Sequence, residues 1–390
     1  MSNLRITDIK TYIVPAVPHS KGQWNKSKTF LFVKLETNKG IDGWGEAYAL
    51  GQRERSTEML FTEMKRYLID YDPSRIKYFQ YWAYNLFGER RPGIDLFCAA
   101  SGIEIAMWDI MGKYYNTPVY NLLGGQVHNK LRMYANINSD FESLSSEIEK
   151  AREMVKLGYT AIKISPFDYC EEEDGIIERV AKLREAIGDK VDLLVDVWRN
   201  ADAKLVLNVA QRIEPYRICW FEEPIAPDNL DVAAEIRSKT SLSIVAGECI
   251  CGKRGANEVF KKNAADILNV DVTVVGGILE LKEIAAMAEA NYIKIAPHNC
   301  NSHAVGTFAS VNAACTMPNF YLLEIFPSYR EMGEKICKNP LPVEEGYIHI
   351  PDAPGLGVEM NEDYLASITY REGPKDTRKI TGQIGNQKQY

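Results

Sequence analysis

Three acidic residues follow successive apolar runs at a constant interval in this sequence. Asp196 ends the run LLVD, Glu222 lies in CWFEE and Glu248 ends SIVAGE, so both intervals are 26 residues (222 − 196 and 248 − 222). That length fits one strand followed by one helix. Because the carboxyl ends of all strands converge on one face of a parallel α/β barrel, the three carboxylates would meet on that face. Three carboxylates so close would repel one another unless a hard divalent cation held them.

Further ionisable residues follow this series at similar intervals, and one precedes it. Asp271, His298 and Glu324 follow at 23, 27 and 26 residues (271 − 248, 298 − 271 and 324 − 298), each after an apolar run. Lys163 precedes the series in TAIKIS. We therefore expect seven strands whose carboxyl ends carry side chains able to bind a metal, transfer a proton or attract an anion.

Strands and helices alternate through the region that contains these residues. Short runs rich in Val, Ile, Leu, Tyr or Phe predict eight strands, at 131–136, 160–165, 191–196, 219–223, 243–248, 266–271, 292–297 and 320–325. Between them, apolar residues recur every three or four positions, which predicts helices packed on a sheet by one face, at 144–159, 176–188, 203–216, 230–240, 256–265, 279–290 and 303–316. Such alternation predicts a parallel sheet, and eight strands predict a closed barrel over residues 128–327.

The segments on either side of this region have a different pattern. Two alternating runs at 5–15 and 28–48, the second broken by Asn-Lys-Gly, predict strands and a hairpin, and residues 53–115 are helical in pattern. We expect residues 1–127 to form an α+β domain. Residues 328–390 return to short strands and turns, and we expect this C-terminal segment to rejoin the N-terminal domain.

Composition excludes several other classes of protein. The chain has 390 residues, 46% of them hydrophobic, with a net charge of −7 and scattered basic residues, which argues against nucleic acid or an anionic membrane as the main partner. It shows neither a signal-peptide pattern nor an apolar run long enough to span a bilayer, so we expect a cytoplasmic protein. Among eight cysteines, Cys249 and Cys251 are the only close pair. A zinc site there is disfavoured because no CxxC pair accompanies them.

Several short motifs, in order and at matching spacing, together resemble one enzyme family. They are GWGEAY, ASGIEIAMWDIMGK, PVYNLLGG, VDV, FEEP, AGE, NVD followed by GG, APHN and PGLGVEMN. Over essentially the whole chain the sequence resembles the enolase superfamily, mandelate racemase-like subgroup, and within it the acid-sugar dehydratases of gluconate type. That resemblance implies an α/β fold built from a modified TIM barrel of (β/α)7β type, with an α+β capping domain formed by the N-terminal region and the C-terminal tail. It also implies Mg²⁺ as cofactor, a small acid sugar as substrate and a homo-oligomer.

The resemblance implies a role for each strand-end residue. Metal ligands would be Asp196, Glu222 and Glu248, while His298 with Asp271 would form the base dyad, the carboxylate fixing the tautomer of the imidazole. Lys163 would assist the substrate carboxylate, and Glu324 would hydrogen-bond the enediolate oxygen. Each has a structural alternative: strand-end acids can cap helix N-termini, a histidine can fill the barrel rim, and a lysine can lie in solvent.

Two positions depart from the subgroup pattern. Ser165 stands where the Lys-x-Lys motif of racemases has its second lysine, and Trp198 stands where some dehydratases have a histidine. No second base or separate acid is therefore visible. We expect His298 to remove the proton and then protonate the leaving hydroxyl on the same face, which gives syn elimination.

Substrate selection is expected to lie at the mouth of the barrel. Candidate substrate-binding residues are Ser165, Trp198 and Arg199 at strand ends and Trp24 in the polar loop 18–30, with a contribution from residues 48–55. The expected reaction is dehydration of a sugar acid to a 2-keto-3-deoxy acid. Two alternatives remain open: a racemase, epimerase or cycloisomerase on the same scaffold, and a non-catalytic sugar-acid binder.

Overall fold

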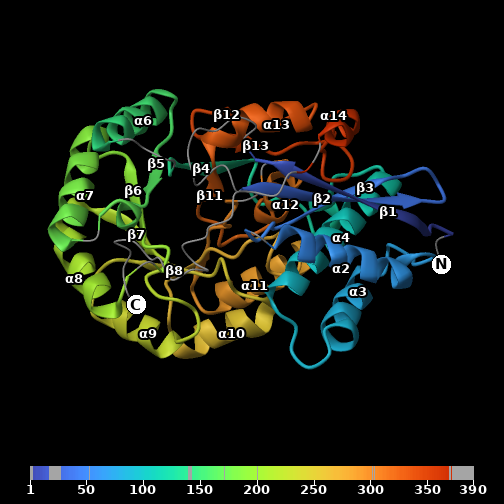
Figure 1. Ribbon diagram of the computed structural model, residues 1–390, viewed down its shortest axis with the longest axis horizontal. Helices are drawn as coiled ribbons and strands as arrows, with labels where there is room; N and C mark the ends of the chain where they lie inside the picture. The colour runs from blue at the N-terminus through green and yellow to red at the C-terminus, as the bar shows by residue number, and fades with distance from the viewer. Residues whose placement is uncertain are drawn as a thin grey trace.

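A computed structural model describes most of the chain as an N-terminal layer packed on the side of a ring of strands and helices (Figure 1). Described are residues 3–16, 28–51, 53–138, 143–170, 172–199, 201–300, 302, 304–368 and 370. Trp24 lies outside these residues, as does most of the polar loop 18–30. In the described part of the chain, no helix combines the length and apolar character needed to cross a membrane.

The N-terminal layer is an antiparallel sheet covered by helices. Its strands, in the order β1-β2-β3, are β1 (Ile6–Pro15), β2 (Thr29–Thr37) and β3 (Gly43–Ala47). The helices are α2 (Glu54–Leu68), α3 (Ile76–Trp82), the π-helix η1 (Ala83–Phe87), α4 (Ile94–Tyr114) and α5 (Val119–Leu122). Helix α4 lies so close to β3 that a Cβ atom at Gly43 or Gly45 would come within 2.1 or 1.8 Å of a helix carbonyl oxygen. Glycine is therefore required in the GWG motif.

Eight parallel strands form the barrel, as predicted. They are β4 (Lys130–Asn136), β5 (Ala161–Ile164), β6 (Asp192–Asp196), β7 (Ile218–Glu222), β8 (Ile244–Ala246), β9 (Ile267–Leu268), β10 (Lys294–Ile295) and β11 (Leu323–Ile325). Each pairs in parallel with the next from β4 to β10. The barrel closes because β11 pairs with β4 and a parallel bridge joins Ile295 to Phe320.

One helix connects each pair of consecutive barrel strands, close to the predicted ranges. These helices are α6 (Leu144–Lys156), α7 (Glu173–Ile187), α8 (Ala203–Ile213), α9 (Leu230–Ser238), α10 (Gly252–Lys262), α11 (Ile278–Ala290) and α12 (Val305–Ala314). Figure 1 shows α6 to α9 along the outside of the ring, on the side away from the N-terminal sheet. The predicted α/β fold, a barrel with an N-terminal capping sheet, is confirmed.

Buried side chains of the capping layer bind the ends of barrel helices. Glu46, from the GWGEAY motif, accepts a hydrogen bond from the backbone N–H of Gly306 at 2.7 Å, near the start of α12. Glu104 of α4 accepts from the backbone N–H groups of Ile278 and Leu279 at 2.7 and 2.9 Å, at the start of α11. Carboxylates at helix N-termini satisfy donors that lack partners within the helix. These two motifs therefore dock the capping layer on the barrel.

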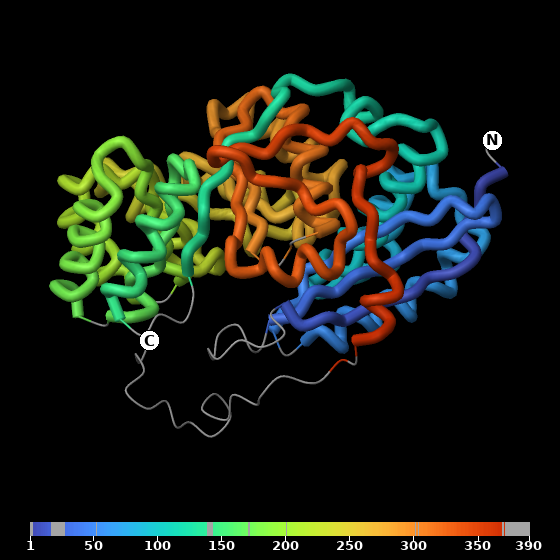
Figure 2. Tube along the Cα trace, turned by 90° about the horizontal axis from the view of Figure 1, so that it is seen from above, coloured from blue at the N-terminus to red at the C-terminus, as the bar shows by residue number. Residues whose placement is uncertain are grey.

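The C-terminal segment contacts both parts of the molecule. It contains α13 (Arg330–Ile336), β12 (Val343–Glu344), β13 (Tyr347–His349) and α14 (Glu362–Ser367). Strand β13 pairs antiparallel with the start of β4, so it extends the barrel sheet. Further along, Glu362 accepts hydrogen bonds from Tyr12 and Lys34 of the capping sheet at 2.7 and 2.8 Å, and Figure 2 shows this segment passing from the barrel to that sheet. The division into 1–127, 128–327 and 328–390 stays a prediction.

Candidate active site

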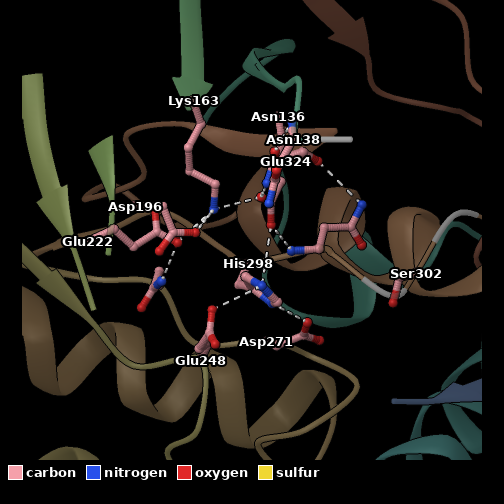
Figure 3. A network of polar contacts seen from close by, with 12 residues as sticks. Asn136, Asn138, Lys163, Asp196, Glu222, Glu248, Asp271, His298, Ser302 and Glu324 are labelled. Carbon is pink, nitrogen blue, oxygen red and sulfur yellow. Dashed lines mark hydrogen bonds and ion pairs between the residues drawn. The ribbon is translucent and has the colours of Figure 1, made fainter. Parts of the chain in front are cut away.

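A layer of apolar side chains inside the barrel determines which residues form the site. It consists of Tyr134, Ala161, Leu194, Trp220, Val245, Ile267, Ala296 and Leu322. Since alternate residues of an extended strand share a face, the residues two positions further along also point toward the barrel axis. Apart from Gly247, they are polar: Asn136, Lys163, Asp196, Glu222, Asn269, His298 and Glu324. Figure 3 shows the labelled members of this set converging at the carboxyl ends of the strands.

Lys163 lies at the centre of this polar layer. Its Nζ is 2.7 Å from Glu222 Oε1, 2.8 Å from Glu324 Oε1 and 3.5 Å from Asp196 Oδ2, and the side chain is 1% exposed. Burial alone would lower the pKa of Lys163, but the carboxylates of Glu222 and Glu324 outweigh it and hold that pKa well above its ordinary value. The alternative of a lysine in solvent is wrong.

His298 and Asp271 form a buried dyad, as the sequence suggested. Nδ1 of His298 is 2.7 Å from Asp271 Oδ2. The other oxygen of Asp271 accepts hydrogen bonds from the backbone N–H and the hydroxyl of Thr273 at 2.8 and 2.6 Å. A carboxylate oxygen can only accept hydrogen bonds, so Nδ1 is the ring nitrogen that donates to Asp271. Nε2 is thereby left to exchange a proton on the side of the polar layer.

Carboxylates surround the outer nitrogen of that imidazole. Nε2 lies 3.2 Å from Glu248 Oε2 and 3.6 Å from Glu324 Oε2. Burial alone would lower the pKa of His298, but Glu324 and Glu248, together with the hydrogen bond to Asp271, raise it well above its ordinary value. The ring of Tyr48, which comes from the capping layer, packs beside the imidazole with 6.2 Å between ring centroids. Residue 48 thus contributes to the wall of the site.

Glu248 extends beyond β8 and is bound on its outer side by Arg199. Nη1 of Arg199 is 2.7 Å from Glu248 Oε1 and 2.9 Å from Glu223 Oε2. Glu223, the residue after Glu222, therefore points away from the axis. Its Oε1 accepts hydrogen bonds from the backbone N–H groups of Gly247 and Glu248 at 2.8 and 3.2 Å. Glu223 has a supporting position rather than one inside the cup.

The donor set suits a divalent cation in its chemistry. Asp196 and Glu222 are register partners on adjacent strands, and Glu248 follows the next strand. Burial and the nearby carboxylate of Glu222 raise the pKa of Asp196 well above its ordinary value. Six carboxylates, from residues 196, 222, 223, 248, 271 and 324, share this network with Lys163, Arg199 and His298. The excess of negative charge favours a hard cation with oxygen ligands.

The side-chain positions are those of carboxylates paired with protein cations. Within the part of the chain that the structure describes, no group of three His, Cys, Asp or Glu side chains is arranged to hold a metal ion. Lys163 contacts Asp196 and Glu222, whereas Arg199 and His298 contact Glu248. The residue types and the strand register fit a divalent cation, and the carboxylates would have to exchange protein cations for it.

The expected substrate-binding residues differ in their surroundings. Ser165 is 2% exposed, and its hydroxyl has no hydrogen-bond partner among the described residues. Trp198 is 43% exposed at the rim. Arg199 faces two carboxylates, which favours a supporting role over a substrate contact. Trp24 lies outside the described residues.

Two asparagines of the polar layer were not predicted. Asn136 donates to Glu324 Oε1 at 2.8 Å, and Asn269 donates to Glu222 Oε1 at 3.1 Å. Both are buried, and Oδ1 of Asn269 has no partner among the described residues. Their signal in the sequence was an amide at the end of an apolar run, two positions after Tyr134 and Ile267. The sequence prediction was restricted to ionisable residues, so it did not include these two amides.

A separate cavity of about 330 Å³ lies between α3, η1, α4 and α10. Its lining is mainly apolar and aromatic, including Phe79, Tyr84 and Phe97. None of the predicted site residues that the structure describes lines it. The cavity is therefore not part of the polar site.

Family models match both parts of the chain. The mandelate racemase / muconate lactonizing enzyme N-terminal domain matches residues 8–124, and the enolase C-terminal domain-like family matches residues 147–364. The chain therefore belongs to the mandelate racemase/muconate lactonizing enzyme group of the enolase superfamily. Enzymes of this group typically use a divalent metal.

Individual relatives resemble the chain over nearly its full length. D-galactonate dehydratase of Ralstonia pickettii (strain 12J) is 32% identical over 379 residues, which cover 92% of this chain and 93% of that protein. D-xylonate dehydratase of Haloferax volcanii is 29% identical over 374 residues, covering 92% and 87%. The crystal structure of a mandelate racemase/muconate lactonizing enzyme candidate from Burkholderia SAR-1 has a TM-score of 0.87 and 32% identity, with 95% of each chain covered.

Proposed function

We propose that the protein is a Mg²⁺-dependent dehydratase of a sugar acid, of the aldonate or aldarate class. The observation that carries this proposal is the dyad of His298 and Asp271, 2.7 Å apart, whose outer nitrogen faces the carboxylates of Glu248 and Glu324. Similarity to relatives that dehydrate D-galactonate and D-xylonate supports this reaction class.

The proposed metal ligands are Asp196, Glu222 and Glu248. A divalent cation bound there would hold the substrate carboxylate and offset the second negative charge that forms on it when the C2 proton leaves. Lys163 would attract the same carboxylate. Glu324, positioned by Asn136 and by the backbone N–H of Asn299 at 2.8 Å, would hydrogen-bond the developing enediolate. Burial would raise the pKa of Glu324, but Lys163 and His298 lower it to about 2, so Glu324 must take up a proton before it can donate that bond.

His298 would perform both proton transfers. Because the neighbouring carboxylates raise the pKa of His298, Nε2 must first give its proton to solvent. The neutral Nε2 then takes the C2 proton, the C2–C3 double bond forms as the C3–oxygen bond breaks, and the imidazolium returns the proton to the departing hydroxide. One water leaves, and the enol tautomerises to a 2-keto-3-deoxy acid. At the second racemase position, Ser165 has a hydroxyl that is not basic enough to accept the C2 proton. Its hydroxyl, which lacks a partner among the described residues, is available to a substrate hydroxyl.

A panel of stereodefined acid sugars incubated with the protein and Mg²⁺ tests the proposal. Formation of a keto acid, detected as its semicarbazone and abolished by EDTA, is the expected result. Deuterium exchange at C2 in ²H₂O without keto-acid formation would instead support a racemase or epimerase. Binding of an acid sugar with neither reaction would support a non-catalytic binder.

A further inference from the structure

We propose that Arg199, held by Glu223, is a positioning residue for Glu248, which it orients so that only Oε2 is left to bind the divalent cation. This inference rests on the proposed function, because it concerns one of the proposed metal ligands. It replaces the expectation that Arg199 contacts the substrate.

The two oxygens of Glu248 have different partners. Oε1 is 2.7 Å from Arg199 Nη1, whereas Oε2 is 3.2 Å from His298 Nε2. Arg199 therefore occupies the oxygen that faces away from the dyad. With one oxygen bound by the guanidinium, Glu248 can offer a cation a single oxygen, which is the geometry that a small octahedral ion such as Mg²⁺ accepts.

Glu223 fixes the guanidinium and the backbone of Glu248 at the same time. Oε2 of Glu223 accepts from Arg199 Nη1 at 2.9 Å, while Oε1 accepts from the N–H groups of Gly247 and Glu248 at 2.8 and 3.2 Å. The side chains of Arg199 and Glu223 are 18% and 2% exposed. Water competes little for buried ionic hydrogen bonds, so this arrangement is rigid.

The backbone conformation places Arg199 where it can reach two strands. Trp198, Arg199 and Glu223 have φ values of 50°, 58° and 45°, in the left-handed region that residues with a Cβ atom rarely adopt. The backbone N–H of Arg199 donates to the carbonyl of Glu223 at 2.9 Å. Strained residues tend to gather at functional sites, where the surrounding contacts hold them. Here Arg199, in the turn after β6, contacts Glu223 after β7 and Glu248 two residues beyond the end of β8.

The experiment measures metal binding without substrate. Mn²⁺ is titrated into the protein and free Mn²⁺ is followed by electron paramagnetic resonance, with Mg²⁺ as competitor. The variants are R199M, R199K and E223Q. Loss of an outer contact to a metal ligand typically weakens affinity by about 10–100-fold. We expect R199M and E223Q to show that loss, and R199K to regain part of it because one ammonium can still contact Glu248.

Arg237→Met is the matched control. Arg237 of α9 donates to Asp266 Oδ1 at 2.9 and 2.6 Å, and Asp266 accepts a backbone N–H from Ile244. The same kind of arginine–carboxylate–backbone contact thus occurs at the opposite ends of strands β8 and β9. R237M should bind Mn²⁺ like the wild type, although its unfolding midpoint should fall. R199K and E223Q keep the test decisive if R199M fails to fold.

The outcomes distinguish failure of the positioning role of Arg199 from failure of the proposed metal site. Unchanged Mn²⁺ affinity in R199M and E223Q would overturn the positioning role. Unchanged metal affinity with a raised KM for the acid sugar would show that Arg199 contacts the substrate instead. Failure of the wild-type protein itself to bind Mn²⁺ or Mg²⁺ would overturn the proposed metal site, and with it this inference.

Discussion

Replacing Asp271 by Asn should remove the base without removing the site. In the native protein Oδ1 of Asp271 accepts two hydrogen bonds from Thr273, and Oδ2 accepts the Nδ1–H of His298. The backbone N–H of Thr273 can only donate, so the oxygen of the new amide must stay on that side. Its NH₂ group then faces Nδ1 and donates to it. His298 is forced into the tautomer that carries its proton on Nε2, which cannot accept the C2 proton.

The magnitude follows from the role of the base. General base catalysis contributes about 10²–10⁴-fold, which corresponds to about 3–5 kcal/mol of transition-state stabilisation. We expect kcat of Asp271→Asn to fall by that factor while KM changes by less than about 3-fold, because Asp271 makes no proposed substrate contact. Steady-state formation of the keto acid at saturating Mg²⁺ measures both constants.

Asp109→Asn is the control for loss of a buried carboxylate. Asp109 accepts hydrogen bonds from the backbone N–H groups of Trp44 and Leu356 at 2.9 Å each, away from the strand ends. Its replacement should lower the unfolding midpoint and leave kcat within about 3-fold of the wild type. If Asp271→Asn kept more than about a third of the wild-type kcat, the tautomer argument would be refuted.

Three further predictions concern the metal, the buried lysine and the contact between the layers. Mn²⁺ binding should weaken at least about 10-fold in each of the variants Asp196→Asn, Glu222→Gln and Glu248→Gln. The control Asp192→Asn, at the other end of β6, should bind Mn²⁺ like the wild type. Equal Mn²⁺ affinity in all four variants would exclude the ligand assignment. Lys163→Met leaves Glu222 and Glu324 buried without their cation. The free energy of unfolding, measured with a chemical denaturant in the absence of metal, should therefore fall by about 3–5 kcal/mol. An unchanged unfolding midpoint would show that the two carboxylates find other partners. Glu104→Ala removes the partner of two backbone N–H groups at the start of α11, so the free energy of unfolding should fall by about 2–4 kcal/mol. The exposed control Glu63→Ala should leave it unchanged. Equal unfolding midpoints in the two variants would mean that water replaces the carboxylate of Glu104.

Most of the fold could be predicted from the periodicity of apolar residues, because each helix or strand buries one face. Apolar runs that carry ionisable residues near their ends placed Lys163, Asp196, Glu222, His298 and Glu324 on one inner layer, which the alternation of side chains along a strand explains. Sequence spacing could not show which carboxylate pairs with which cation. Those pairs depend on the register of neighbouring strands and on the side-chain conformations.

Other features of the site depend on contacts between distant segments. Residues 48–55 were expected to contribute at the barrel mouth, but the contact of Tyr48 with His298 depends on the packing of the capping layer on the barrel. The contact of Glu223 with the backbone of Glu248 depends on a positive φ at Glu223 that the sequence does not suggest. Asn136 and Asn269 are buried amides whose role is defined by the carboxylates they contact. A pattern search restricted to ionisable residues cannot find them.

The exchange of the C2 proton by His298→Asn tests the central claim most directly. An acid sugar that the wild-type protein dehydrates is incubated with each protein in ²H₂O and saturating Mg²⁺, and deuterium at C2 of recovered substrate is measured by NMR together with keto acid. We predict that His298→Asn, folded and still binding Mn²⁺, gives neither keto acid nor exchange. Exchange at the wild-type rate in His298→Asn would show that another group, with Lys163 the first candidate, removes the proton.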